Sequence, residues 1–535
     1  MNNFEKLDWI FIISYFGLIS IIGMWVSQRK KTSNDYFLAG KKMSWLAVGA
    51  SLFAANISSE HYIGLAGSGA TSGLAVGNFE WLAIFALLLL GWLFVPFYLR
   101  SSVFTMPEFL EKRYGKSCRM YLTSVSIISY IITKMSVTIF AGALLLNFIM
   151  GWNMVTSSIL LVIVTGLYTI AGGLESVVYT SIIQTLLLIV GASILTIFGL
   201  KEVGWIAGLR EKVPSDFFSM FKPINHPDFP WTGIMFGAPI LGVWYWCTDQ
   251  YIVQRVLGAK NIEHARAGTI LASYLKLLPV FILVLPGIIA VAMFPGVKSD
   301  QAFPMLVSSY LLPAGLKGLV IAGLLAALMS SLASCFNSIS TLFTMDLYTN
   351  LRYGAGEKEL VLVGRLATTA MVILSILWIP FIRSISSQLF VYLQSVQAYI
   401  APPITAVFVI GILWRRANNT GAFTTLIFGA IVGMLRLVLE ILWKKGLISL
   451  GPLAWFVQMN FLHFAILLFL TSVLIMYSGS LFSRKTDIYK SKYIEHSIGR
   501  NCNFKLNSIS NFDKYNLIFS VIVVSLLVVL WIVFR

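Results

Sequence analysis

The segment AANISSEHYIG, residues 54–64, places an amide, hydroxyls, a carboxylate and an imidazole inside a run that is otherwise apolar and Gly-rich. The run, residues 44–72, is long enough to cross a bilayer as a helix, since one crossing needs about 20 mostly apolar residues. Unwound backbone and ionisable side chains at that depth are tolerated where they line a cavity or bind a ligand. We therefore expect a broken helix that carries a binding site, with functional roles for Glu60 and His61.

The composition of the whole chain is that of a polytopic membrane protein. Of its 535 residues, 58% are hydrophobic and 11% are charged, and the mean hydropathy is +0.83. A soluble protein of this length needs far more polar surface, and outer-membrane barrels show no long apolar runs. The four cysteines are scattered and show no metal-binding spacing with the five histidines, so neither a disulfide framework nor a structural metal is indicated.

Fourteen apolar spans are predicted, which makes the fold an all-α polytopic membrane protein. They lie near residues 8–26, 44–72, 80–99, 120–148, 154–172, 177–200, 236–254, 269–294, 312–345, 363–382, 388–413, 421–441, 457–479 and 515–534. Most Lys and Arg fall in alternate loops, including 27–43, 99–119, 254–268 and 480–514. The positive-inside rule then predicts a multi-pass protein of the cell inner (plasma) membrane with both termini extracytoplasmic. The net charge of +17 is thus a topology signal, and no nucleic acid partner is expected.

A second polar break, GVWYWCTDQ at 242–250, follows the first by five helices. Two interrupted spans at corresponding places in two halves are typical of inverted-repeat transporters, whose site lies where those helices unwind. The expected organisation is a first helix and cytoplasmic loop (1–43), a first repeat of five helices (44–200), an extracytoplasmic loop (201–235), a second repeat of five helices (236–413), and three C-terminal helices (414–535) with a basic cytoplasmic loop near 480–514.

Further polar side chains stand within or beside the other spans. GNFEW (77–81) carries Glu80, SYLKLLP (273–279) carries Lys276, and VYLQSVQAYIAPP (391–403) carries Gln394 ahead of an expected helix break at Pro402 and Pro403. With the aromatic residues of the second break, these groups offer hydrogen-bond partners and a flat apolar face, which a neutral polyol needs. The alternative for Glu80 and Lys276 is a purely structural ion pair.

The segment AALMSSLASCFNSIST, residues 326–341, carries hydroxyls on one helical face. Ser330 and Ser331, one turn after the carbonyl of Ala327, offer hard oxygen donors without net charge, which suit a weakly held monovalent cation better than Ca²⁺. The alternative is that these serines hydrogen-bond within their own helix. Likewise, the amide and hydroxyls of residues 56–59 could merely bond neighbouring helices.

Over roughly residues 35–420, these motifs in this order resemble the sodium/glucose cotransporter branch of the sodium:solute symporters. The resemblance implies a LeuT-like five-plus-five inverted repeat with extra helices at both termini. It implies a sodium ion bound by the carbonyls of Ala54, Ile57 and Ala327 and the hydroxyls of Ser330 and Ser331. It further implies a sugar site of Asn56, His61, Glu80, Lys276 and Gln394, with an inner aromatic wall of Tyr245 and Trp246. The implied gate consists of Tyr245 with Leu65, Phe79 and Phe390 on the outer side.

The predicted function is sodium-coupled import of a hexose, of glucose or galactose type, by alternating access in a monomer, with no enzymatic activity. The ISSEH stretch also resembles the myo-inositol branch, so inositol is the alternative substrate. No unpaired Arg is evident in the expected pocket, which disfavours a sialic-acid-type substrate. The short loop between the eighth and ninth spans, without a Cys-rich insertion, favours a bacterial source.

Parts of the sequence also fit two other classes of protein. An intramembrane hydrolase could use Ser58 or Ser59 with His61, but no oxyanion-hole motif accompanies them. A transport-dead sugar sensor is disfavoured because no signalling domain is evident in the sequence.

The stretch SVVYTSIIQT, residues 176–185, bears on stoichiometry. Ser181 occupies a position where many relatives have an aspartate that belongs to a second sodium site. A hydroxyl lacks the charge that a second cation in low dielectric needs most. We therefore expect one sodium per sugar.

Overall fold

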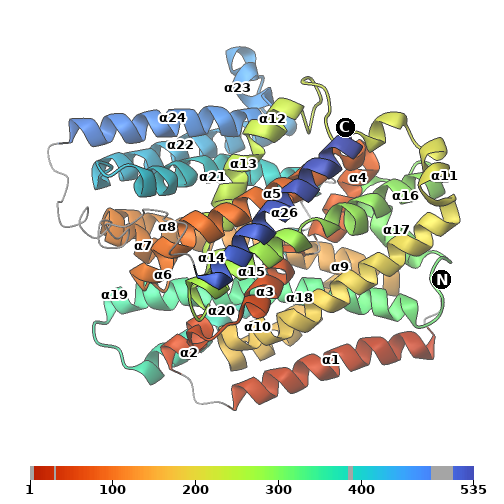
Figure 1. Cartoon of the computed structure of the whole chain (residues 1–535), viewed down its shortest axis with the longest axis horizontal. Helices are drawn as coiled ribbons and strands as arrows, with labels where there is room; N and C mark the ends of the chain where they lie inside the picture. Colours follow the sequence, from red (N-terminus) through yellow and green to blue (C-terminus); the bar gives the residue numbers. More distant parts are fainter. Residues whose placement is uncertain (1–4, 29–31, 59, 383–388, 484–509) are drawn as a thin grey trace.

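Helices form nearly all of the regular structure in this computed structural model, which describes residues 5–28, 32–58, 60–382, 389–483 and 510–535 (Figure 1). Within those ranges there is no β-strand beyond two isolated bridges, so the all-α prediction is confirmed. Eleven helical stretches of the described residues are long and apolar enough to cross a membrane. The exact number of crossings, fourteen from the sequence, remains a prediction, as do the domain boundaries.

The described residues up to 212 form eleven α-helices, separated in places by single π-helical turns. They are α1 (Lys6–Ser27), α2 (Ser33–Leu38), α3 (Trp45–Asn56), α4 (Ala66–Ser72), α5 (Asn78–Leu89), α6 (Val95–Ser101), α7 (Met106–Arg113), α8 (Lys116–Ser129), α9 (Ser136–Met150), α10 (Met154–Val203) and α11 (Trp205–Lys212).

The remaining described helices follow a loop at 213–230. They are α12 (Trp231–Phe236), α13 (Ala238–Val243), α14 (Gln250–Leu257), α15 (Ile262–Leu275), α16 (Leu285–Met293), α17 (Ala302–Ser308), α18 (Leu316–Leu342), α19 (Thr349–Leu351), α20 (Glu357–Ile382), α21 (Leu389–Leu413), α22 (Asn419–Lys444), α23 (Ala454–Gln458), α24 (Phe461–Phe482) and α26 (Asn511–Val533).

The break predicted at AANISSEHYIG is present between α3 and α4. Ile57, which caps α3, is extended (φ −72°, ψ 115°), and the chain re-enters helical structure through a π-helical turn, Glu60–Leu65. Gly64 in this turn packs directly on α21, since a Cβ there would lie 2.9 Å from both the Cβ and the backbone N of Phe390. Only glycine permits that approach, so the sequence of the turn sets how closely α21 covers the break.

The second predicted break lies between α13 and α14. A π-helical turn, Trp244–Thr248, is followed by Asp249 in an extended conformation (φ −78°, ψ 125°), after which α14 begins. π-helical turns of this kind occur frequently at functional sites. Both helix breaks that the sequence predicts at polar motifs are therefore present.

Helix α10 is one stretch of 50 residues that changes direction at Gly173 (φ +58°). At about 1.5 Å per residue it measures roughly 75 Å, more than twice the roughly 30 Å thickness of a hydrocarbon core. The positive φ strongly favours glycine, and a Cβ at this position would lie 2.5 Å from the carbonyl oxygen of Tyr36. The kink thus separates the segments predicted as the fifth and sixth spans.

The predicted helix break at Pro402 and Pro403 is wrong, because α21 continues through both prolines to Leu413. Proline removes two backbone donors, but helix α22 packs tightly against the affected turn. A Cβ on Gly433 would lie 2.2 Å from the carbonyl oxygen of Tyr399, and one on Gly429 would lie 2.4 Å from Pro403. The small residues, four apart on α22, let the two helices meet closely enough to keep the turn intact.

Helix α18 is the most enclosed of the long helices. In its most apolar stretch 94% of the residues are buried, and α1, α3, α10 and α20 all contact it. Its N-terminal end is fixed by Asp8 of α1, whose Oδ1 accepts hydrogen bonds from the amides of Gly315 (2.9 Å) and Gly318 (2.7 Å). The serine-rich segment is therefore held in the centre of the bundle, beside the break in the first interrupted helix.

Candidate functional site

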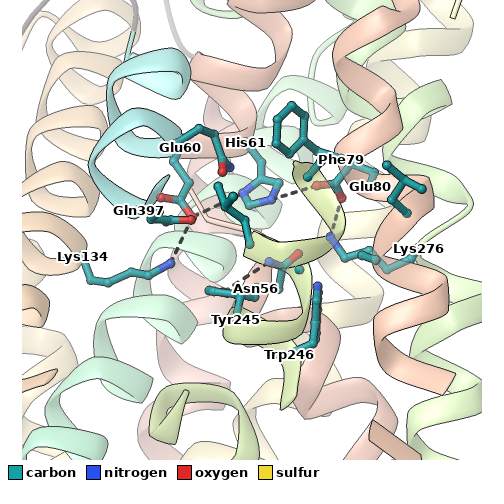
Figure 2. A pocket seen from close by; sticks show the side chains of 16 residues that line it. Asn56, Glu60, His61, Phe79, Glu80, Lys134, Tyr245, Trp246, Lys276 and Gln397 are labelled. Atoms are coloured by element: carbon teal, nitrogen blue, oxygen red, sulfur yellow. Dashed lines mark hydrogen bonds and ion pairs between the residues drawn. The ribbon is translucent and has the colours of Figure 1, made fainter. Parts of the chain in front are cut away.

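A polar cavity lies where the two interrupted helices meet α5, α15 and α21 (Figure 2). Seven of the residues around it are those predicted for the sugar site: Asn56, His61, Glu80, Tyr245, Trp246, Lys276 and Gln394. The structure thus brings together side chains that are as much as 338 residues apart in the chain. Glu60, Phe79, Lys134 and Gln397 line the same cavity.

A continuous line of ionisable groups crosses the cavity, as Figure 2 shows. Lys134 Nζ lies 3.8 Å from Glu60 Oε1, which lies 3.8 Å from His61 Nδ1. His61 Nε2 lies 3.4 Å from Glu80 Oε1, and Lys276 donates a short hydrogen bond to Glu80 Oε2. Each ammonium has one carboxylate partner, so with a neutral imidazole the line carries no net charge. Pairing of this kind is what makes buried charge tolerable inside a membrane.

Each of the two lysines also faces an aromatic ring of the second break. Lys134 Nζ lies 4.4 Å from the centre of the Tyr245 ring, and Lys276 Nζ lies 5.3 Å from that of Trp246. The two rings meet edge to face, with centroids 5.2 Å apart and an interplanar angle of 85°. Asn56 Nδ2 donates to the Tyr245 hydroxyl at 3.2 Å, which links the first break to the second.

Two acceptor atoms in the cavity have no hydrogen-bond partner in the described part of the chain: Asn56 Oδ1 and Glu60 Oε2. An unsatisfied buried polar atom costs roughly 1–3 kcal/mol. In native structures such atoms call for an explanation, and a ligand that donates hydrogen bonds is one. The cavity is therefore prepared for hydroxyl or amine donors.

Aromatic side chains close the cavity on the side of α5 and α21. The Phe79 and Phe390 rings meet edge to face with centroids 5.6 Å apart, and Phe229 lies 6.0 Å from Phe79. Leu65 and Phe390 are buried. The enclosed space is about 60 Å³, room for a few water molecules at about 10–15 Å³ each. The cavity must therefore widen before it can hold a sugar.

Uncharged oxygen atoms gather on the other side of the first break, against α18. Ser331 Oγ donates to the carbonyls of Ala55 (3.1 Å) and Ile57 (3.3 Å). The Tyr251 hydroxyl donates to the Ala55 carbonyl (2.7 Å) and to that of Ser331 (3.2 Å). Ser331 therefore bonds across to the broken helix. Ser334 and Ser338 donate within α18 and also bond to α14, where Arg255 donates to Ser334 Oγ and Ser338 Oγ donates to Gln254.

The remaining residues predicted as sodium ligands adjoin this cluster. Ser330 Oγ lies 3.4 Å from Ser181 Oγ of α10. Ala54 and Ala327 are fully buried in the adjoining turns of α3 and α18. No group of three or more His, Cys, Asp or Glu side chains suited to a metal ion occurs within the described residues. The oxygen cluster is neutral, which fits a weakly held monovalent ion rather than a divalent one.

The geometry around His61 does not support a hydrolase. His61 Nδ1 accepts the backbone amide of Ser58 (3.4 Å), while the Ser58 hydroxyl accepts the amide of Glu60 (3.2 Å). The serine hydroxyl and the imidazole thus have other partners, and the nucleophile–base hydrogen bond that defines such a site is not formed. Ser59 lies outside the described residues.

The fold and the cavity define a multi-pass membrane transporter, with interrupted helices around a central polar site. Residues 36–429 match the sodium:solute symporter family, and the chain belongs to this family. Sodium/glucose cotransporter 4 of Mus musculus is 44% identical over 88% of this chain and 74% of its own length. The sodium/mannose cotransporter of Bos taurus is 46% identical over 89% of this chain and 86% of its own length.

Among solved structures, a substrate-bound, outward-open Na⁺-coupled sialic acid symporter has the same fold. It matches with a TM-score of 0.77 at 23% identity, covering 90% of this chain and all of that one. The family makes this chain a sodium-coupled solute symporter and not an enzyme, with sodium as the coupling ion. The likeness to the solved structure shows that its fold is LeuT-like.

Three polar cavity residues, Lys134, Glu60 and Gln397, and one backbone carbonyl are absent from the predicted site. Lys134 is a lone lysine in an apolar span, and its position alone could have flagged it. Glu60 was expected to be functional, but its partner was unknown. Gln397 lies one turn after Gln394 on α21, a spacing that places both on one helix face. The carbonyl of Ala55 had no sequence signal, because every residue carries one.

Proposed function

We propose that the protein imports a hexose, of glucose or galactose type, together with sodium by alternating access. The observation that supports this most directly is the pair of unpartnered acceptors, Asn56 Oδ1 and Glu60 Oε2, in a cavity of paired charges. Sugar hydroxyls can donate to both acceptors, and the carboxylates, ammonium groups and amides around them supply further partners. The rings of Tyr245 and Trp246 suit the apolar face of a pyranose.

A neutral substrate is favoured over an acid. Both lysines of the cavity are already paired with carboxylates, and no arginine lines the cavity in the described residues. A substrate carboxylate would face Glu60 and Glu80 without a free cation, at the cost of like-charge repulsion in low dielectric. myo-Inositol, which is neutral and rich in hydroxyls, remains the alternative substrate.

The sodium ion is assigned to the oxygen cluster between α3 and α18. Its proposed ligands are the carbonyls of Ala54, Ile57 and Ala327 and the hydroxyls of Ser330 and Ser331. Asn56, Glu60 and His61 of the same broken helix face the sugar cavity. An ion that orders the break also orders the sugar site, and this shared element couples the two binding events. With no carboxylate in the cluster, we propose one sodium per sugar.

The protein is proposed to act as a monomer in the cell inner (plasma) membrane, with both termini extracytoplasmic. The basic loops at 27–43, 99–119 and 480–514 then face the cytoplasm. Labelling of single introduced cysteines with a membrane-impermeant reagent in intact cells tests this orientation. Labelling of residue 2 without permeabilisation is the expected result, and labelling of residue 490 instead would reverse the topology.

The test of function is sodium-gradient-driven uptake into proteoliposomes. Labelled glucose, galactose, mannose, myo-inositol and a sialic acid are compared at equal concentration, with potassium in place of sodium as the control. Accumulation of a hexose that requires the sodium gradient is expected. Accumulation of inositol alone would select the alternative, and accumulation of the sialic acid alone would contradict the neutral-substrate proposal.

A further inference from the structure

A second cavity, apolar in character, lies at the surface of the bundle between α15 and the C-terminal helix α26. Its volume is about 580 Å³, within the roughly 300–1,000 Å³ range of small-molecule sites. The residues around it include Trp45, Ala267, Leu271, Tyr274, Phe512 and Phe519. An apolar cavity of this size excludes water and takes up apolar ligands.

The polar contacts between α15 and α26 lie along the edges of this cavity. Asp513 Oδ2 pairs with Arg266 Nη1 at 2.5 Å, and Asn516 Nδ2 donates to the Glu263 carbonyl at 3.5 Å. The Tyr274 hydroxyl donates to the Phe519 carbonyl at 2.8 Å. These bonds fix α26 across α15, as Figure 1 shows for the dark blue helix. The cavity is therefore a built feature of the interface.

The length of the cavity matches one leaflet of a bilayer. Along α26 its lining runs from Phe512 to Ile522, a rise of about 15 Å at about 1.5 Å per residue. This is half of the roughly 30 Å hydrocarbon core. The lining begins in the first turn of α26, so the cavity opens at the level where that helix enters the membrane.

Two exposed lysines, Lys42 and Lys260, lie in the loops at that end of the cavity, near its residue Trp45. Reciprocal backbone bonds between Met43 and the 258–260 turn, each 3.1 Å, hold Lys42 and Lys260 beside each other. His264, one turn after Lys260, stacks near the cavity residue Phe512 with centroids 5.3 Å apart. Both lysines belong to loops predicted to be cytoplasmic, where the membrane surface is anionic.

We propose that this cavity holds an acyl chain of an anionic phospholipid from the cytoplasmic leaflet, with its phosphate at Lys42 and Lys260. The apolar walls and the length of one leaflet fit the acyl chain. The lysines at the open end fit the anionic headgroup. Arg266 is already paired with Asp513, so Lys42 and Lys260 are the cations offered to a headgroup. The bound lipid fills the space between α26 and α15, the helix whose C-terminal end leads to Lys276.

The proposal is tested with phosphatidylglycerol that carries a photoreactive diazirine in its acyl chain. The full-length protein is reconstituted in phosphatidylcholine with a trace of this probe, irradiated, digested and sequenced by mass spectrometry. Labels are expected on Leu271 and Phe519. Excess unlabelled phosphatidylglycerol should displace them about thirtyfold more effectively than phosphatidylcholine of the same chains, since two lysines near the surface contribute that selectivity.

Two variants separate the chain site from the headgroup site. Ala267→Trp fills the cavity and should abolish the labels, whereas Leu366→Trp on the exposed face of α20 should not. Lys42→Gln/Lys260→Gln, at exposed positions that do not threaten folding, should keep the labels but lose the preference for phosphatidylglycerol. Lys358→Gln/Lys445→Gln is the matched control. Labels spread evenly over lipid-facing helices, equal displacement by both lipids, or a polypeptide cross-linked at Phe519 would overturn the proposal.

Discussion

One side of the break between α3 and α4 carries two lysines, two glutamates and a histidine, and the other carries uncharged oxygens of serine, tyrosine and backbone carbonyls. The first region balances its own charges through the pairs Lys134–Glu60 and Lys276–Glu80. The second has no charge of its own. A neutral sugar must find polar partners whose charges are already balanced, whereas a cation brings a charge to a neutral site. The two regions therefore respond to different substitutions.

The neutrality of the oxygen cluster has the largest expected consequence, for stoichiometry. One charge crossing about 150 mV supplies roughly 3.5 kcal/mol, so one ion more or less changes the limit of accumulation about 300-fold. We expect a ratio of one sodium per sugar from reversal potentials in proteoliposomes. Ser181→Asp should raise the ratio to two, and Ser181→Ala should leave it at one. A wild-type ratio of two would show that the neutral cluster holds a second ion.

The charge balance of the cavity predicts the next largest effect. Glu80→Gln leaves Lys276 buried without its carboxylate, which should lower the free energy of unfolding by about 3–5 kcal/mol. Sugar affinity should fall about hundredfold, measured by equilibrium binding of labelled sugar.

The double variant Glu80→Gln/Lys276→Met provides the control for this effect. It should recover thermal stability but not sugar binding, because the unpaired charge is gone while the sugar partners stay lost. Arg352→Gln, in an ion pair at the exposed surface, should change stability by less than about 1 kcal/mol. If the double variant bound sugar with wild-type affinity, Glu80 and Lys276 would form an ion pair that stabilises the fold but does not bind the sugar.

Within the oxygen cluster, Ser331→Ala should weaken sodium binding about tenfold, since one hydroxyl ligand contributes on the order of 1–2 kcal/mol. Sugar binding at saturating sodium should survive, because the hydroxyl does not face the cavity. The measurement is the sodium dependence of sugar uptake. The control is Ser340→Ala, on the same helix as Ser331. It removes a hydroxyl that donates to the carbonyl of Gly364 on α20. Equal sodium dependence in both variants would place the ion elsewhere.

Gln394→Ala should affect the sugar cavity and leave the sodium site unchanged. It should weaken sugar binding several-fold to tenfold by removing one amide from the cavity, with sodium dependence at saturating sugar unchanged. Gln458→Ala, at an exposed position, controls for the substitution itself. If sodium affinity fell together with sugar affinity, the two regions would not be separable as their chemistry predicts.

The smallest effect concerns the loop beside the aromatic closure. His226 Nδ1 accepts the amides of Asp228 (3.3 Å) and Phe229 (3.0 Å), and partial burial lowers the pKa of His226 below 6.5. The neutral ring stabilises the loop fully above pH 6.5, and this contribution is lost as the pH falls through the lowered pKa. Burial raises the pKa of Asp228 above 3.8, so Asp228 acts in the opposite sense.

Acidification should therefore loosen Phe229 from Phe79 and ease opening on that side. We expect the uptake rate to rise about threefold as the pH is lowered from 7.5 to 5.5. This factor corresponds to the free energy of roughly one hydrogen bond. His226→Gln should flatten this profile, whereas His463→Gln should preserve it. If the pH profile of His226→Gln equalled that of the wild type, protonation of His226 would not control opening of the cavity.

The positions of the breaks and of most cavity residues could be read from the sequence because lipid offers no partner to a polar group. A polar side chain in an apolar span is therefore conspicuous, as with Glu80, Lys276 and Gln394. Which of these polar side chains contact each other could not be predicted from the sequence. Lys134 and Glu60 are 74 residues apart, and only the packing of the π-helical turns brings them within 3.8 Å of each other.

What the sequence determined alone is thus the all-α membrane fold, the two interrupted helices and the chemical character of each side of the first one. Tertiary structure decided the rest. α21 continues through Pro402 and Pro403 because Gly429 and Gly433 let α22 pack against the affected turn. Ser331 bonds to the carbonyls of Ala55 and Ile57 because α1, α3 and α10 hold α18 against the break. Both outcomes depend on contacts between distant segments, which no local pattern encodes.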